Sequence, residues 1–267
     1  MSHGSRGVND GPFEPSLAVS VDHDLRLAFG SGVEGPDTEV RHLDEIRSSL
    51  QDPNVTGPDA LYGIAMDVAQ AHDRPVLEDA RLLFGIVAFA AGTIGDTPVR
   101  SQGHVHAVTP RSGWSPPEVF QIWRGSAVIL MHETAQDDPG RCYAIHAGPG
   151  EIVVTPPGWA HATINADPSR PLVFGAWCDR DYAGFEYADV RRHRGLAWIP
   201  TVGDGGTLIW HANPAYVRRP LEERGPQETL GFQVGRCIYR QAVERSDLGT
   251  CVPHPDRCEA LWRDFEP

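Results

Sequence analysis

The chain has 267 residues, enough to bury a substantial core as one large β domain or as two smaller domains. Its formal net charge of −13 and its pI near 5.3 argue against nucleic acid as a partner, because an acidic surface repels a phosphate backbone. No apolar run reaches the roughly 18 residues that a membrane span needs, and the first residues lead into no signal segment. We therefore expect a cytoplasmic protein without a membrane partner.

Turn-forming residues and cysteines narrow the class of protein further. With 28 Gly and 23 Pro, the chain must interrupt its elements often, which favours a sandwich or barrel over a helical bundle. The number of cysteines is odd and nothing points to secretion, so reduced thiols are expected. The cysteines are Cys142, Cys178, Cys237, Cys251 and Cys258. The spacing of the last three matches no familiar pattern of a structural zinc site.

The first 50 residues predict an arm followed by one helix. Residues 1–40 mix Gly, Pro, Ser and Asp around one apolar stretch at 17–21. This composition is typical of a partly ordered arm that can add an outer strand and whose first dozen residues are mobile. Residues 41–50 have apolar side chains at helical spacing, and Pro53 follows as a stop.

From residue 61 onward the pattern becomes that of a β domain. Short apolar runs recur about every ten residues, with Gly or Pro between them. We expect strands at residues 61–68, 82–91, 119–123, 127–131, 141–145, 151–155 and 171–177, and a last short strand at 207–210. Such a series describes an antiparallel sandwich or barrel.

The rest of the chain is more polar. The basic segment 189–195 is expected to be a solvated turn after the barrel, and residues 218–267 form a polar tail with scattered apolar anchors. We therefore divide the chain into an N-terminal arm (1–40), a main β domain (41–217) and a C-terminal extension (218–267).

Two short stretches carry side chains that can hold a metal. His104 and His106 flank one residue, so in a strand they point to the same side, as a chelating pair requires. Glu118 opens the next strand, which a hairpin would return beside the first. His161 follows a Pro-Pro-Gly turn that would aim it inward. Three imidazoles and one carboxylate suit a divalent ion such as Fe, Mn, Ni, Co or Zn and leave positions open for substrate oxygens.

The spacing around these four residues is more specific than any one of them. A lone histidine on an apolar face is usually a structural residue. Here, Glu118 is followed by Gly125, and His161 lies within an ordered series of Gly, Pro and Asn residues. The members of that series are Gly150, Pro156, Gly158, His161 and Asn165.

These residues resemble the two sequence motifs of the cupin superfamily. More specifically, the Gly-His-Val-His run at 103–106, the Glu-Val-Phe run at 118–120 and the Pro-Pro-Gly-Trp-Ala-His-Ala-Thr-Ile-Asn run at 156–165 resemble the cupin-type glucose-6-phosphate isomerases. The resemblance covers about residues 60–216. It implies an all-β cupin jelly-roll barrel, here with an N-terminal arm, a short helix and a C-terminal extension, usually assembled as a homodimer.

The same resemblance implies an activity and a set of site residues. The family interconverts glucose 6-phosphate and fructose 6-phosphate with a divalent metal, one per chain. The metal ligands would be His104, His106, Glu118 and His161, of which Glu118 and His161 are also the catalytic candidates. The residues near the sugar phosphate would be Tyr62, Thr93, Ser101, Gly103 and Tyr187. Further phosphate donors suggested by residue type are Thr97 and Arg100.

Several positions depart from the family pattern. Eleven residues, 107–117, separate His106 from Glu118 where the family has about six, which adds a loop at the rim of the expected pocket. Phe120 replaces a tyrosine, Phe185 stands where a histidine is common, and Pro98 replaces a glycine. These changes leave the expected fold and metal site intact and bear on the choice of substrate.

Three classes of function remain open at this stage. The first is sugar-phosphate isomerisation, in which Glu118 takes a proton from C2 and returns it at C1, or a hydride shifts between the same carbons. Within that class, another sugar or sugar phosphate could be isomerised or epimerised. The second is an Fe(II) cupin dioxygenase, which the same ligands permit. The third is a non-catalytic sugar-binding or regulatory cupin, which the complete ligand set disfavours.

Overall fold

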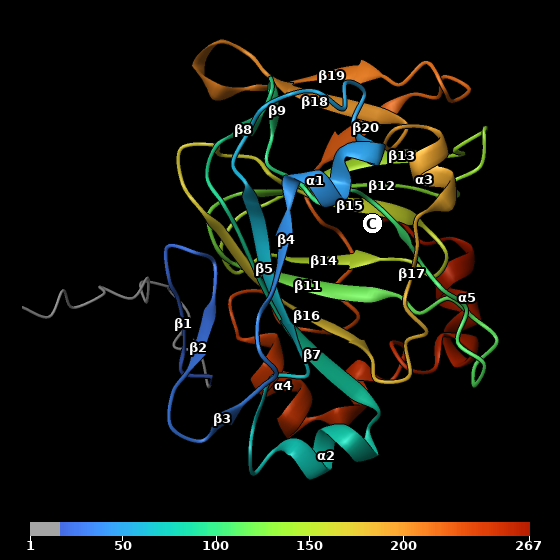
Figure 1. Cartoon of the computed structure of the whole chain (residues 1–267). Helices are drawn as coiled ribbons and strands as arrows, with labels where there is room; N and C mark the ends of the chain where they lie inside the picture. Colours follow the sequence, from blue (N-terminus) through green and yellow to red (C-terminus); the bar gives the residue numbers. More distant parts are fainter. Residues whose placement is uncertain (1–16) are drawn as a thin grey trace, which may run out of the picture.

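A computed structural model describes residues 17–267, so the expectation for the first dozen residues lies outside the described part of the chain. Two sheets form the body of the molecule (Figure 1). The larger sheet has the order β14 (Ile152–Thr155), β11 (Glu118–Arg124), β16 (Leu172–Asp179), β7 (Leu82–Phe89), β5 (Ala60–Met66), β4 (Glu39–His42). The smaller sheet has the order β15 (Ala160–Asn165), β12 (Ala127–His132), β13 (Cys142–Ala147), β20 (Leu221–Arg224). Neighbouring strands are antiparallel except β13 and β20, as a jelly roll requires of its main strands.

Short ribbons and helices complete the described residues. The ribbons pair β1 (Val19–Val21) with β2 (Leu27–Phe29), β3 (Val33–Glu34) with β6 (Ala69–Gln70), β8 (Thr93–Ile94) with β9 (Thr97–Pro98), β10 (Val105–His106) with β17 (Phe185–Glu186), and β18 (Trp198–Val202) with β19 (Leu208–Ala212). The helices are α1 (Leu43–Ile46), η1 (Arg47–Ser49), α2 (Arg74–Asp79), α3 (Ala188–Arg192), η2 (Asp204–Gly206), α4 (Ile238–Glu244), η3 (Ser246–Gly249), η4 (Pro255–Cys258) and α5 (Glu259–Arg263). No described helix is long and apolar enough to cross a bilayer.

The strands β7 and β16, at the centre of the six-stranded sheet, are buried on both faces, which explains their long apolar sequences. On β16, Leu172, Phe174 and Ala176 belong to the core between the two sheets. Their neighbours Val173 and Trp177 belong to a second core on the outer face. Because alternate side chains of a strand point to opposite faces, both sets must be apolar when both faces are covered.

The C-terminal extension supplies much of the cover on the outer face. Ile238, Tyr239, Trp262 and Phe265 are buried in the same core as Trp177. The Tyr239 ring stacks on the Trp177 indole with 5.7 Å between ring centroids, and the indole Nε1 donates to the carbonyl of Ile238 at 3.1 Å. In Figure 1, α4 lies beside β16 and β7, on the side away from β12 and β15. The extension therefore packs on the barrel of its own chain.

The expected strands are found with their bounds shifted by a few residues, whereas β15, β18, β20 and several strands of two to four residues were not expected. The helix predicted for 41–50 begins only at Leu43, because residues 39–42 form the edge strand β4 instead. The basic segment 189–195 is not a solvated turn: it includes part of α3, with Val190 and His193 buried.

The expectation of five reduced thiols is also wrong, because Cys251 and Cys258 form a disulfide. The turn between η3 and α5 brings their Cα atoms within 5.8 Å, inside the range that a disulfide can bridge. Cys142, Cys178 and Cys237 are free. The disulfide leaves no thiolates at 251 and 258 for a structural zinc site.

Candidate metal centre and substrate pocket

Four side chains from three segments of the chain meet between the two sheets. His106 lies on β10, Glu118 on β11 and His161 on β15, while His104 directly precedes β10. The expected hairpin between residues 104–106 and Glu118 is wrong, because β10 pairs with β17. His104 instead forms a bridge to His161, with backbone N–O distances of 3.0 and 2.9 Å in the two directions. Long-range pairing thus brings the two histidine motifs together.

The donor atoms of these side chains are close enough to share one ion. One ligand atom from each of the four residues lies within 4.8 Å of the others. The Nε2 atoms of His106 and His161 lie 3.4 and 3.5 Å from the same carboxylate oxygen, Oε2 of Glu118. The three imidazole rings have centroids 4.4 to 5.2 Å apart. The sequence prediction of a converging group is confirmed by this geometry.

The hydrogen bonds of the rings leave the inward nitrogens free for a cation. The Nδ1 atom of His106 lies 2.9 Å from the carbonyl of Pro116, and that of His161 lies 3.1 Å from the carbonyl of Trp159. A carbonyl only accepts, so each Nδ1 carries the hydrogen and each Nε2 presents a lone pair. Among the described side chains, the Nε2 atoms of His104, His106 and His161 are buried without a hydrogen-bond partner. Buried polar atoms without partners are costly, and a divalent ion would satisfy all three.

The electrostatics of the site favour a neutral imidazole at His104 and an ionised carboxylate at Glu118. Burial lowers the pKa of His104 well below its ordinary value, and the neighbouring histidines lower it further. Burial alone would raise the pKa of Glu118, but the adjacent side chains of His106 and His161 outweigh burial and lower it. Neutral imidazole and carboxylate are the protonation states in which these groups bind metals.

Two further contacts hold ligands in place. The thiol of Cys178 donates to Oε1 of Glu118 at 3.4 Å, leaving Oε2 to face the histidines. Pro116, which orients His106, belongs to the extra loop at 107–117. Arg111 in that loop donates to the carboxylate of Asp181 at 2.9 Å and also to the carbonyl of Pro253. The loop is therefore tied to the C-terminal extension and orients the candidate ligand His106.

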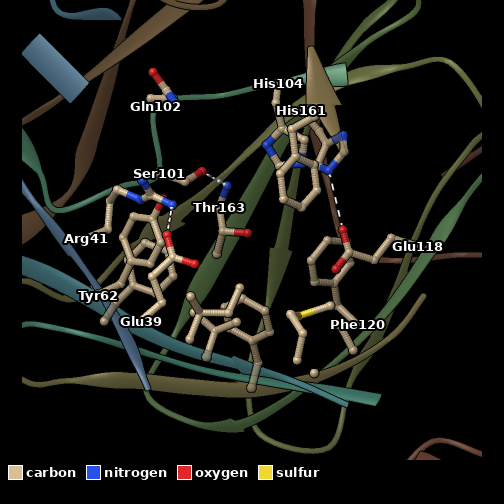
Figure 2. Close-up of a pocket in the computed structure, with 18 of the residues that line it drawn as sticks. Glu39, Arg41, Tyr62, Ser101, Gln102, His104, Glu118, Phe120, His161 and Thr163 are labelled. Atoms are coloured by element: carbon tan, nitrogen blue, oxygen red, sulfur yellow. Dashed lines mark hydrogen bonds and ion pairs between the residues drawn. The ribbon is translucent and has the colours of Figure 1, made fainter. Parts of the chain in front are cut away.

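A cavity of about 260 Å³ opens beside the donor group. His104, Glu118 and His161 line one side of it (Figure 2). Its floor is apolar and is built from Ile64, Val87, Phe89, Phe120, Phe174 and Ala176. A small ligand can thus lie over an apolar floor with one end at the metal site.

The expected substrate contacts divide into two groups. Tyr62, Ser101 and Tyr187 line the cavity. Thr93, on β8, and Gly103 are absent from the described residues that line it. Gly103 has φ +86°, and a Cβ atom there would lie 3.2 Å from the side chain of Leu196, so backbone geometry accounts for the glycine.

Other lining residues were missed by sequence reasoning. Glu39, Arg41, Gln102 and Tyr182 line the cavity, while Arg100, suggested earlier as a phosphate donor, is buried elsewhere and donates to the carbonyls of Ser49 and Ser101. The sequence signal that could have identified Glu39 and Arg41 was their alternation in a short strand. That alternation was overlooked because the helix was expected to begin at residue 41.

Comparisons with known proteins agree with this site. The sequence profile of the glucose-6-phosphate isomerase (GPI) family matches residues 43–218, well over half of the chain. A glucose-6-phosphate isomerase of Thermococcus litoralis is 29% identical over 200 residues, covering 72% of this chain and 95% of the relative. One of Pyrococcus horikoshii is 28% identical over 184 residues, covering 67% and 86%.

Among solved structures, a Bacillus subtilis oxalate decarboxylase variant matches with a TM-score of 0.35 at 12% identity. That match covers 50% of this chain and 30% of the other, and it is too weak to carry an argument. The family profile extends over every strand that contributes a metal donor. The chain therefore belongs to the cupin-type glucose-6-phosphate isomerase family.

Proposed function

We propose that the protein interconverts glucose 6-phosphate and fructose 6-phosphate, using one divalent ion held by His104, His106, Glu118 and His161. The observation that carries this proposal is the group of three buried Nε2 atoms without partners around one carboxylate oxygen. Family membership supports the isomerase activity. The donor set suits Fe, Mn, Ni, Co or Zn.

An aldose–ketose isomerase must move one hydrogen between C1 and C2 and another between their oxygens. A divalent ion supplies a Lewis acid that polarises a carbonyl and stabilises negative charge on oxygen. The side chains of this protein would orient the sugar and exclude water. His104 and His161 place the reacting end of the sugar near Glu118, and the apolar floor keeps bulk water away.

Glu118 is the candidate base of the reaction. Its lowered pKa keeps it ionised at neutral pH, and Cys178 fixes its orientation. As a base it would take the proton from C2 and return it at C1. A hydride shift would use the same residues, and the two routes differ in solvent exchange. Deuterium from solvent at C1 or C2 of the product would support proton transfer, and complete retention in a single turnover would contradict it.

The proposal is tested by a coupled assay of glucose 6-phosphate conversion before chelation, after chelation and after restoring single divalent ions. We expect activity to disappear on chelation and to return with at least one of the five metals. The control is His23→Ala, since His23 is 90% exposed and lies outside the donor group. Purified protein that holds metal but does not convert either sugar phosphate would contradict the proposed activity.

The remaining proposals concern assembly and location. We propose a sugar phosphate as the small-molecule partner, a homodimer as the assembly and the cytoplasm as the location. Light scattering of the purified protein measures the number of chains in the particle directly, from its mass relative to the 29.2 kDa chain. A monomer at working concentration would contradict the dimer.

A further inference from the structure

The end of the cavity away from the metal donors holds a single cationic side chain. Arg41 lies on the edge strand β4, just before the residues 43–218 that match the family profile. Figure 2 shows Arg41 beside Glu39, Tyr62 and Ser101, across the view from the metal donors. Among the described residues that line the cavity, Arg41 is the only lysine or arginine. A phosphoryl group bound in this acidic protein therefore has one nearby cation in the pocket.

The guanidinium of Arg41 is held by two carboxylates that differ in how firmly they are fixed. Nη1 donates to Glu45 at 2.8 Å, and Nη2 donates to Glu39. Glu45 also accepts from the backbone N–H of His42 at 2.7 Å, as part of the cap of α1. Glu39 is 64% exposed, and the structure describes no other side-chain partner for its carboxylate. Glu39 can therefore turn into solvent and release Nη2, while Glu45 keeps the guanidinium in place.

A further donor of the same side chain is already free. The Nε atom of Arg41 is buried and has no hydrogen-bond partner among the described residues. Nε and one Nη of an arginine form a planar fork that matches two oxygens of a phosphate. Displacement of Glu39 would complete that fork. The unpaired Nε would then gain the partner that it lacks.

Neutral donors surround the guanidinium. Burial raises the pKa of Tyr62, despite the opposing charge of Arg41, and burial also raises the pKa of Tyr187. Both phenols therefore stay protonated at neutral pH and can donate. The hydroxyl of Ser101 accepts from the backbone N–H of Thr163 at 3.1 Å, which leaves its own hydrogen available. These three hydroxyl groups line the cavity.

We propose that Arg41 binds the phosphoryl group of the sugar phosphate through Nε and Nη2, and that the phosphoryl group replaces Glu39 on Nη2. This inference rests on the proposed function, because it names the group that recognises the phosphate of that substrate. The substrate then spans the cavity, with its carbonyl end at the metal donors and its phosphoryl end at β4. In the free protein, the Glu39 carboxylate accepts from Nη2 and competes with the phosphoryl group for it. Glu39 therefore lowers the affinity of the pocket for phosphate.

The test uses steady-state kinetics of the metal-loaded enzyme with Arg41→Met and Glu39→Gln. Loss of a charge-assisted hydrogen-bond pair predicts that Arg41→Met raises the KM for glucose 6-phosphate by about 10- to 100-fold, with kcat changed by less than about threefold. The inhibition constant of inorganic phosphate, used as a competitive inhibitor, should rise by a similar factor. Glu39→Gln removes the competing charge and should lower both KM and the inhibition constant of phosphate.

Matched controls separate phosphate binding from general damage. Arg26→Met removes an exposed arginine of the arm, and it should change neither constant. Arg41→Lys keeps the charge without the fork and should give intermediate values. Thermal unfolding of each variant identifies loss of folding. The proposal is overturned if Arg41→Met lowers kcat at unchanged KM, or if Glu39→Gln weakens phosphate inhibition.

The inference that Arg41 binds phosphate can also be tested without relying on isomerisation of glucose 6-phosphate. Calorimetry with inorganic phosphate measures the same site in a protein without turnover. Phosphate binding that is lost in Arg41→Met supports the inference even if the proposed activity fails. Wild-type protein that shows no phosphate binding, or binding unchanged in Arg41→Met, contradicts the inference even if the activity is confirmed.

Discussion

The packing of the C-terminal extension on the sheet that carries Glu118 makes a strong prediction about Tyr239. The Tyr239 ring is fully buried, stacks on Trp177 and meets the Phe84 ring at 5.2 Å between centroids. Its hydroxyl donates to the buried carboxylate of Asp73 at 3.0 Å. Tyr239→Ala removes the ring and leaves a cavity between the sheet and α4, which costs about 3–5 kcal/mol for an aromatic side chain.

For a chain of this size, each kcal/mol lowers Tm by roughly 2–4 °C, so we expect Tyr239→Ala to lower it by roughly 6–20 °C. Tyr239→Phe keeps the ring and removes only the hydroxyl, which costs about 1–3 kcal/mol. Arg240→Ala is the control, because Arg240 is exposed on the same helix. Thermal unfolding followed by circular dichroism measures all three variants. A shift for Tyr239→Ala no larger than that for Arg240→Ala would show that the extension does not pack on the sheet as described.

Three further predictions concern the base, the pH dependence of stability and the disulfide. Glu118→Gln should lower kcat by at least about 100-fold in the coupled assay, because it removes both a metal ligand and the candidate base. Retention of more than a tenth of kcat would contradict that role. Burial alone would raise the pKa of Asp67, but ion pairs with two arginine side chains outweigh burial and lower it below 3.8. The stabilisation from Asp67 is therefore complete above that pH and is lost as pH falls through the lower folded pKa. The Tm difference between wild type and Asp67→Asn should shrink in a pH series below 4, and a constant difference would count against the ion pairs. Reduction of Cys251–Cys258 should lower Tm by roughly 4–12 °C, since a short cross-link contributes about 2–3 kcal/mol. The same reductant should leave the Tm of a Cys251→Ser, Cys258→Ser variant unchanged. An equal fall of Tm in that variant would show that the reductant destabilises the protein by a route other than this disulfide.

The four candidate metal donors could be predicted from sequence because local geometry carries most of the information. Residues two apart in a strand share a face, so His104 and His106 had to point together wherever the strand paired. The spacing around His161 identified the second motif. The pairing itself was predicted wrongly, because a hairpin to Glu118 was assumed and β10 pairs with the distant β17. Strand partners depend on long-range packing, which local periodicity does not encode.

The features missed in the sequence depend on contacts between distant segments. Arg41 became a pocket residue only because β4 joins the edge of the larger sheet beside Tyr62. Cys178 contacts Glu118 because β16 and β11 pair with their inward faces in register. The C-terminal extension was predicted to be a polar tail because its few apolar residues lie far apart in the sequence. They form a continuous surface only when the short helices fold against Trp177.

The central claim, that four side chains hold one divalent ion, is tested most directly by metal content. Elemental analysis of purified protein should find about one divalent ion per chain in the wild type and in His23→Ala. The same analysis should find almost none in His161→Ala, because that variant removes a nitrogen that faces Glu118 at 3.5 Å. His161→Ala protein that keeps the wild-type metal content would contradict the claim.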